Sequence, residues 1–228
     1  MNDSDSSTPK SKTRILVVDD HPFFRSGLIH WLNRQPALIC SGDADSVAAA
    51  RRAMADLEPD IILLDLRLGD GDGLDLIREL TETHPKIPIV ALSQFDEEAY
   101  AHRALRAGAR GYIMKSAATE TVLAAIQTVL KGEIYDSRRM AARLTQNLFP
   151  DPASNKPDLA QLSDRELQVF QLLGTGSNTR EVAECLNISP KTVETYREHL
   201  KEKLRLPDGP ALLRTATIWV EHGRIELA

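Results

Sequence analysis

The sequence is short of the residues that cross-link or anchor small proteins, and each shortage excludes a class. Cysteine occurs only twice, at Cys40 and Cys185, far apart and without metal-ligand spacing. This excludes a disulfide framework and is typical of the reducing cytoplasm. The six histidines are scattered, so the sequence indicates no zinc site. No apolar run approaches the roughly 20 residues that a membrane helix needs, so we expect a cytoplasmic protein with no membrane partner.

Positive charge is not in excess either. The net charge of the 228 residues is −5, which taken alone argues against a nucleic-acid binder. Any DNA-binding function must therefore rest on local structure. The first twelve residues, MNDSDSSTPKSK, are polar and lack the apolar core of a signal peptide. We expect residues 1–12 to form a disordered tail.

The first half of the chain alternates short apolar runs with helical patterns, which predicts an α/β domain. Five such repeats imply a parallel sheet with helices on both of its faces. The expected strands are 15–18, 37–40, 61–64, 89–92 and 111–114. The expected helices are about 22–34, 46–57, 73–83, 96–107 and 119–131.

The second half contains no strand pattern and predicts a separate, all-α domain. Residues 134–158 are Pro-rich and polar toward their end and indicate a linker, with a further helix expected over 137–148. Ser163 and Glu166 form a capping-box pattern, and Gly174 is predicted to end the helix that follows. Asn178 and the pair Ser189-Pro190 are typical of further helix starts. The four expected helices are about 164–173, 179–186, 190–204 and 210–222, within a domain spanning 159–228.

Polar side chains follow the predicted strands at their carboxyl ends. In an open parallel sheet this edge is where ligands bind, so these side chains can meet in one pocket. Clustered carboxylates favour a hard divalent cation such as Mg²⁺, and a lysine with a hydroxyl can hold anionic oxygens. Each residue alone has a simpler reading, as a strand-end cap or a solvated turn residue. Together they predict phosphoryl transfer to an aspartate. The set comprises Asp19, Asp20, Asp65, Ser93 and Lys115.

The run from Asp70 to Asp75 resembles a calcium-binding loop but fails on spacing. An EF-hand needs an oxygen ligand at loop position 5 and glycine at position 6. Here those positions are Leu74 and Asp75. We therefore interpret this segment as a turn followed by a helix start.

Over residues 13–133 the chain resembles the receiver domain of two-component response regulators. The similar segments are ILVVDDHPFFR, IILLDLRLGDGDGLDLI, IVALS and GYIMKS. The resemblance implies a flavodoxin-like fold with strand order 2-1-3-4-5. It also implies that Asp65 is the phosphoacceptor and that Mg²⁺ binds Asp19, Asp20, Asp65 and the backbone carbonyl of Arg67.

The same resemblance assigns roles around the phosphoryl group. It implies that Ser93 and Lys115 hold that group, and that Tyr112 is the aromatic side chain that swings inward when Ser93 moves. A strand tyrosine has a simpler reading as packing. Gly69 departs from the family pattern, because proline is usual at that position, and this puts the stiffness of the loop in question.

Helices expected at 179–186 and 190–204 have lengths that fit a helix-turn-helix. The longer one places Val193, Leu200 and Leu204 on a core-facing stripe. Another face can point into a major groove. Residues 191–205 include five basic and three acidic residues, a local charge of +2. A plain amphipathic helix with a solvated charged face is the simpler alternative.

The segment LSDRELQVFQLLGTGSNTREVAECLNISPKTVETYREHLKEKLRL resembles the LuxR-type helix-turn-helix of NarL/FixJ-type regulators. Tyr196 stands where many relatives carry histidine. The resemblance implies that the last helix pairs two copies, so we expect a homodimer when phosphorylated. The DNA contacts that it implies are Lys191, Thr192, Thr195, Arg197 and Lys203.

Together these features predict a response regulator rather than an enzyme. A sensor histidine kinase would phosphorylate Asp65 and thereby control binding to double-stranded DNA. One alternative is an orphan receiver that binds DNA without phosphorylation. Another is a Mg²⁺-dependent phosphohydrolase with Asp65 as nucleophile, although no long lid loop is evident to enclose a substrate.

Overall fold

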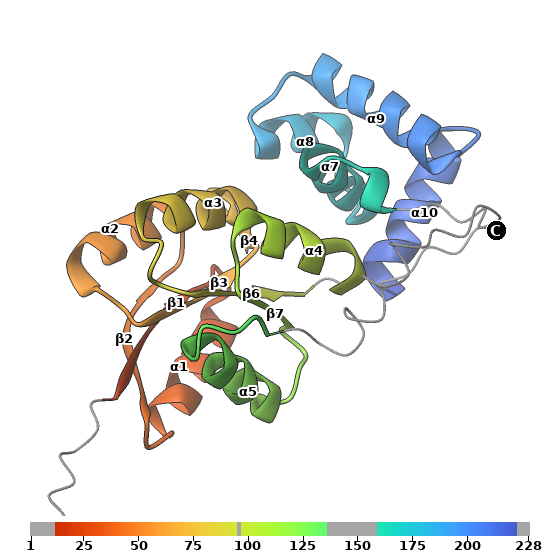
Figure 1. Ribbon diagram of the computed structural model, residues 1–228. Helices are drawn as coiled ribbons and strands as arrows, with labels where there is room; N and C mark the ends of the chain where they lie inside the picture. The colour runs from red at the N-terminus through yellow and green to blue at the C-terminus, as the bar shows by residue number, and fades with distance from the viewer. Residues whose placement is uncertain (1–11, 95–96, 136–158, 223–228) are drawn as a thin grey trace, which may run out of the picture. The chain divides into compact units, whose positions relative to one another are not determined.

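The computed structural model describes residues 12–94, 97–135 and 159–222. The chain divides into two compact units, Met1–Ala142 and Arg143–Ala228 (Figure 1). The helix expected over 137–148 and all of the expected tail except Lys12 lie outside the described residues.

The first unit is built on a five-stranded parallel sheet. Its order is β2-β1-β3-β6-β7, which confirms the expected order of the five main strands. Strand β2 is longer than the predicted 37–40. Its second half, SGDA, has no apolar run that could reveal it in the sequence, and such a polar segment is tolerated because β2 lies at the edge of the sheet. The strands are β1 (Thr13–Val18), β2 (Leu38–Ala44), β3 (Ile61–Asp65), β6 (Ile89–Ser93) and β7 (Gly111–Met114).

Helices cover both faces of this sheet. The central strands β1, β3 and β6 are apolar along nearly their whole length and buried, as expected for parallel strands covered on both sides. One core cluster joins inward-facing strand residues to the helices α1 (Pro22–Asn33) and α5 (Thr119–Leu130). Figure 1 shows α2 (Val47–Leu57), α3 (Gly73–Thr83) and α4 (Glu97–Ala107) on the opposite face. The five expected helices of this unit are thus confirmed.

A small antiparallel pair lies in the segment after β3, where the sequence predicts only a turn. Strands β4 (Arg67–Leu68) and β5 (Gly71–Asp72) pair Arg67 with Asp72 and Leu68 with Gly71. Each has two residues, too few for a periodic pattern to appear in the sequence.

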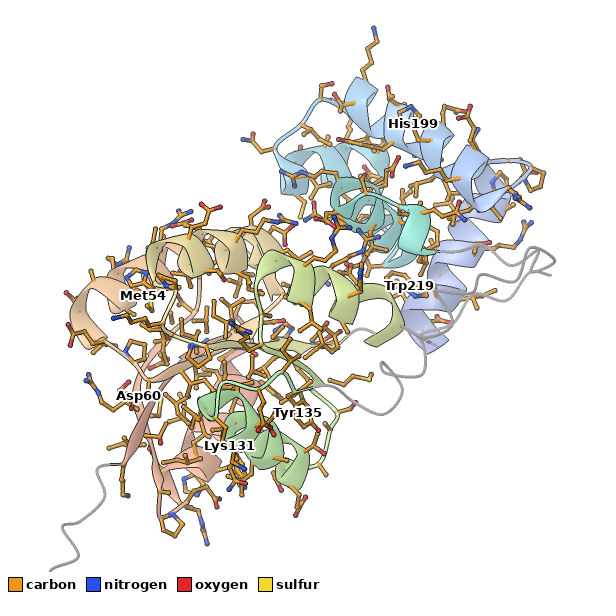
Figure 2. The ribbon with its side chains drawn as sticks, viewed as in Figure 1. Met54, Asp60, Lys131, Tyr135, His199 and Trp219 are labelled. Atoms are coloured by element: carbon orange, nitrogen blue, oxygen red, sulfur yellow. The ribbon has the colours of Figure 1, made fainter. Side chains whose placement is uncertain are left out.

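The second unit is helical within its described residues. A short 3-10 helix (Leu159–Gln161) precedes α7 (Asp164–Gly174), α8 (Thr179–Leu186), α9 (Pro190–Leu204) and α10 (Gly209–His222). The capping box of α7, the Asn178 cap of α8 and the Ser189 cap of α9 form as predicted. At α8 the Glu181 side chain also bonds back to Asn178, so the cap is a full capping box. On α10, Trp219 packs against Phe170 of α7 with ring centroids 5.5 Å apart (Figure 2).

Gly174 has a different role from the predicted one. Helix α7 continues through Gly174 and is capped by Thr175, and the left-handed backbone falls at Gly176. A Cβ at Gly174 would lie 2.4 Å from the backbone oxygen of Ala216 in α10. Glycine is therefore required there because two helices approach closely, a constraint that cannot be seen in one helix alone.

Candidate functional site

An ammonium group joins two carboxylates at the carboxyl edge of the sheet. Asp19 follows β1, Asp65 ends β3 and Lys115 follows β7. The Lys115 Nζ lies 2.7 Å from Asp19 Oδ2 and 2.7 Å from Asp65 Oδ2. The side chains of Asp19, Asp65 and Lys115 are 0%, 3% and 6% exposed. Three strand ends that are far apart in the sequence thus form one buried charged cluster.

Asp20 and His21 complete the cluster on its more exposed side. The His21 Nδ1 lies 2.6 Å from Asp20 Oδ1, 3.4 Å from Asp19 Oδ1 and 3.7 Å from Asp65 Oδ2. Sequence reasoning missed His21, because it treated the histidines as scattered. The available signal was its position directly after the paired aspartates.

Burial controls the ionisation of Asp65. Desolvation raises the pKa of its carboxyl from 3.8 to about 6, although the hydrogen bond and charge of Lys115 and the Arg67 N–H lower it. The negative charge of Asp19 also raises the pKa, and the value of about 6 is the net result of all these effects. In the absence of a metal ion this carboxyl therefore titrates well above an ordinary aspartate.

The cluster fits a divalent cation. One potential ligand atom from each of Asp19, Asp20, His21 and Asp65 lies within 4.8 Å of the others. Among the described residues, Asp19 Oδ2 and Asp20 Oδ1 are buried without a hydrogen-bond partner, and their contacts are the ion pairs with Lys115 and His21. Three carboxylates, two of them with such unused acceptor capacity, form a donor set suited to a hard cation.

Of the remaining predicted residues, Ser93 and Arg67 adjoin the cluster, and Tyr112 is buried on the neighbouring strand. Ser93 is the last residue of β6 and is 1% exposed, and its backbone oxygen accepts a hydrogen bond from the Lys115 N–H. The Arg67 N–H donates to Asp65 Oδ1 at 3.1 Å. Tyr112, on β7, is 2% exposed and so turned into the protein.

The α8–α9 pair forms a helix-turn-helix. Val193, Leu200 and Leu204 are buried, which confirms the predicted core stripe of α9. Lys191 and Thr195 lie on the exposed face of the same helix. The Thr192 N–H and hydroxyl both contact the Ser189 hydroxyl at the helix start.

Two of the predicted DNA-contacting residues, Arg197 and Lys203, have side-chain partners on other helices of their own domain. Lys203 Nζ donates to Oε2 of the buried Glu166 at 2.6 Å, and His199 Nδ1 lies 3.7 Å from the other Glu166 oxygen (Figure 2 labels His199). Arg197 donates to the Thr179 hydroxyl at 3.0 Å. Part of the positive charge on α9 therefore also stabilises the fold.

The architecture of the two units defines a class of protein. A doubly wound sheet with an acidic cluster and a lysine at its carboxyl edge is a receiver domain, and the second unit is a helix-turn-helix domain. Comparison with known proteins gives the same division. Residues 15–127 match the response regulator receiver domain, and residues 160–216 match the luxR family of bacterial regulatory proteins.

Full-length relatives extend this similarity across the chain. The chain is 35% identical to the response regulator GacA of Pseudomonas viridiflava over 214 residues, 93% of this chain and 98% of GacA. It is 36% identical to the oxygen regulatory protein NreC of Staphylococcus aureus, over 89% of this chain and 96% of NreC. RcsB of Salmonella enterica, solved bound to the promoter rprA with the phosphomimetic BeF₃⁻, has a similar fold (TM-score 0.66, 23% identity, 90% of this chain and 98% of RcsB).

The chain therefore belongs to the NarL/FixJ-type response regulators, transcription regulators of two-component systems with a receiver domain and a LuxR-type DNA-binding domain. Within the described residues, no helix is long and apolar enough to cross a membrane.

Proposed function

We propose that Asp65 accepts a phosphoryl group from a sensor histidine kinase, and that this modification controls DNA binding by the second domain. The observation that carries the proposal is the Lys115 ammonium held 2.7 Å from both Asp19 and Asp65. An Asp65 oxygen attacks the phosphorus as the phosphorus–nitrogen bond of the donor phosphohistidine breaks, and the imidazole leaves with a proton. Lys115 offsets the negative charge that develops on the transferred group.

Mg²⁺ is the proposed cation of this site. Asp19, Asp20, Asp65 and the backbone carbonyl of Arg67 would hold it, and oxygen ligands are those that Mg²⁺ prefers. The bound cation would neutralise charge on the phosphoryl oxygens during transfer. Asp19 and Asp20 would therefore serve as ligands of Mg²⁺, and Lys115 would be the positively charged group that the protein itself contributes.

Ser93 and Lys115 are proposed to hold the phosphoryl group after transfer. The phosphoryl group adds negative charge and acceptor oxygens, which draw a hydroxyl and an ammonium toward them. Tyr112 would then follow Ser93, because the two residues lie on the adjacent strands β7 and β6. Ser93 pairs with Met114, which is two residues after Tyr112 on the same strand. Such a shift biases a two-state equilibrium of the receiver.

The proposed DNA contacts lie on α9 and depend on its start. Lys191 and Thr195 are exposed on the helix face, and the first turn offers backbone N–H groups beside Thr192 for a phosphate. Arg197 and Lys203 are proposed as further contacts. RcsB, which shares the fold, was solved bound to promoter DNA, and this supports DNA binding as the role of the second domain. We further propose a cytoplasmic homodimer that binds paired half-sites when phosphorylated.

The test is phosphorylation with acetyl phosphate and Mg²⁺, followed by DNA binding. Wild-type protein should form an acid-stable, base-labile adduct and bind promoter DNA more tightly, and Asp65→Asn should do neither. An unchanged DNA affinity in the modified protein would favour the orphan receiver. Sustained release of phosphate from generic phosphate esters would instead favour the phosphohydrolase.

A further inference from the structure

The loop that follows β3 and the proposed phosphoacceptor Asp65, residues 66–72, contains two glycines. Gly69 and Gly71 lie within it, and glycine loses more conformational freedom on folding than any other residue. Yet this loop has to be held in place, because the Arg67 N–H donates to Asp65 Oδ1 and thereby orients the carboxylate. Something other than local stiffness must fix its conformation.

Both ends of this loop are fastened to the start of α3. The Gly73 N–H donates to the Leu66 oxygen at 3.0 Å, and Asp72 Oδ1 accepts from the Leu74 N–H at 2.8 Å. The β4–β5 pairing then leaves Gly69 and Asp70 at the tip of a tight turn.

The tip is held by a different helix. Asp70 Oδ1 accepts from the Val47 N–H at 2.7 Å, and Asp70 Oδ2 accepts from the Ala48 N–H at 3.1 Å. A carboxylate at a helix N-terminus satisfies free N–H groups and complements the helix dipole. Although desolvation acts to raise it, the pKa of Asp70 is lowered by these two N–H groups.

Packing agrees with this connection, and α2 does not depend on it alone. A Cβ at Gly71 would lie 2.9 Å from Val47 Cγ2, so the first residue of α2 rests on the loop. Helix α2 also has its own cap, since Ser46 Oγ accepts from the Ala49 N–H at 3.3 Å. The Asp70 contacts therefore constrain the loop at least as much as they stabilise the helix.

We infer that Asp70 is a positioning residue of the phosphoacceptor site: by binding the N-terminus of α2 it fixes the loop that orients Asp65 and Arg67. The inference rests on the proposed function of Asp65. Removing Asp70 should loosen the site without removing any of its proposed ligands. Asp70 acts on the ligands through the loop and not by direct contact, so we expect a loss of Mg²⁺ affinity of about tenfold, the lower end of what losing a direct partner of a metal ligand costs.

The experiment compares Asp70→Ala with Ser46→Ala, which removes a cap of the same helix without touching the loop. In the full-length protein, Mg²⁺ binding is followed through amide NMR shifts, and the rate of acetyl phosphate modification is measured against Mg²⁺ concentration. Asp70→Ala should raise the half-saturating Mg²⁺ concentration about tenfold, and Ser46→Ala should leave it within about twofold of wild type.

A third variant separates loop order from other effects. Adding Gly69→Pro to Asp70→Ala should recover most of the Mg²⁺ affinity, because proline restricts the loop by itself. Two observations favour the substitution: a Cβ at Gly69 would lie 3.7 Å from Asp20 Oδ2, an ordinary contact, and the φ of Gly69 is not in the left-handed region. Gly69→Pro alone controls for any direct effect on Asp20.

Equal Mg²⁺ half-saturation in Asp70→Ala and Ser46→Ala would overturn the inference, as would a double variant no better than Asp70→Ala. If Asp70→Ala does not fold, Asp70→Asn keeps one acceptor oxygen and carries the same comparison. Failure of the wild type itself to be modified on Asp65 would instead refute the proposed function.

Discussion

Replacing Lys203 with alanine separates two roles of one basic residue on α9: the proposed DNA contact and an ion pair inside the domain. The resemblance makes Lys203 a DNA contact, and the structure shows its Nζ donating to the buried Glu166 at 2.6 Å. The same Glu166 oxygen accepts from the Ser163 backbone N–H and hydroxyl in the capping box of α7. Lys203→Ala should therefore destabilise the second domain and not only weaken DNA binding.

The size of the effect follows from burial. Breaking a fully buried ion pair costs about 3–5 kcal/mol. The Lys203 side chain is 40% exposed, so solvent screening reduces this, and the Ser163 bonds to Glu166 remain. We expect the free energy of unfolding to fall by about 1–2 kcal/mol, which lowers the Tm of a domain of this size by about 4–16 °C.

The pH dependence gives an independent check. Desolvation raises the pKa of Glu166, but the Lys203 hydrogen bond and the Ser163 donors outweigh it, and the pKa lies below the usual 4.5. A lowered pKa in the folded state gives stability that is present above pH 4.5 and lost as the pH falls through the folded value. The difference between wild type and Lys203→Ala should therefore shrink below pH 4.5.

Tryptophan fluorescence can report on the second domain alone. The chain has two tryptophans, and Trp31 lies on α1 whereas Trp219 is buried on α10. In a Trp31→Phe background, urea unfolding followed at Trp219 measures only the helix-turn-helix domain. Lys191→Ala is the matched control, since Lys191 is exposed on the same helix and should affect DNA affinity but not unfolding. Unchanged stability in Lys203→Ala, with weaker DNA binding, would refute the structural role.

Three further substitutions test other features. Asp65→Asn should raise the free energy of unfolding at pH 7 without Mg²⁺ by about 1–3 kcal/mol. The reason is that a carboxyl with a pKa of about 6 in the folded protein and 3.8 in the unfolded chain costs stability as the pH rises from 3.8 to 6. No gain is expected below pH 3.8, and equal stability of the two proteins at pH 7 in a urea titration would contradict the prediction. Glu58→Gly should add about 0.5–1 kcal/mol by thermal unfolding, because Glu58 ends α2 with a left-handed backbone (φ 36°), and Glu58→Ala should give no such gain. Gly174→Ala should lower the free energy of unfolding by about 1–3 kcal/mol in the Trp219 assay, because the new Cβ would clash with the Ala216 backbone oxygen. An unchanged free energy would mean that α7 and α10 can move apart at no cost.

Most of the fold could be predicted from the sequence because its elements are long and locally signalled. The start of α9 follows from Ser189-Pro190, and its buried stripe follows from the spacing of Val193, Leu200 and Leu204. The five helices of the first domain were likewise located to within one or two residues, since buried parallel strands and amphipathic helices have distinct periods.

What could not be predicted depends on contacts between distant segments. The sequence predicts only a turn at Asp70, because the partners of Asp70 are the N–H groups of Val47 and Ala48, more than 20 residues earlier. The sequence predicts Lys203 as a DNA contact but does not reveal its ion pair, because Glu166 lies 37 residues before it. The acidic site was an exception: the carboxyl ends of parallel strands share one edge, so topology alone brings Asp19, Asp65 and Lys115 together.

The position of Lys115 between two carboxylates makes metal binding an exchange of partners rather than a simple addition. A divalent ion that takes an oxygen of Asp19 or Asp65 must compete with an ammonium already 2.7 Å away. The net affinity is then a difference between two large attractions, and it should be modest. An incoming phosphoryl group would reduce this competition, because its anionic oxygens give the Lys115 ammonium a new partner once the metal ion has taken a carboxylate oxygen. Cation and phosphoryl donor should consequently bind cooperatively, each more tightly in the presence of the other.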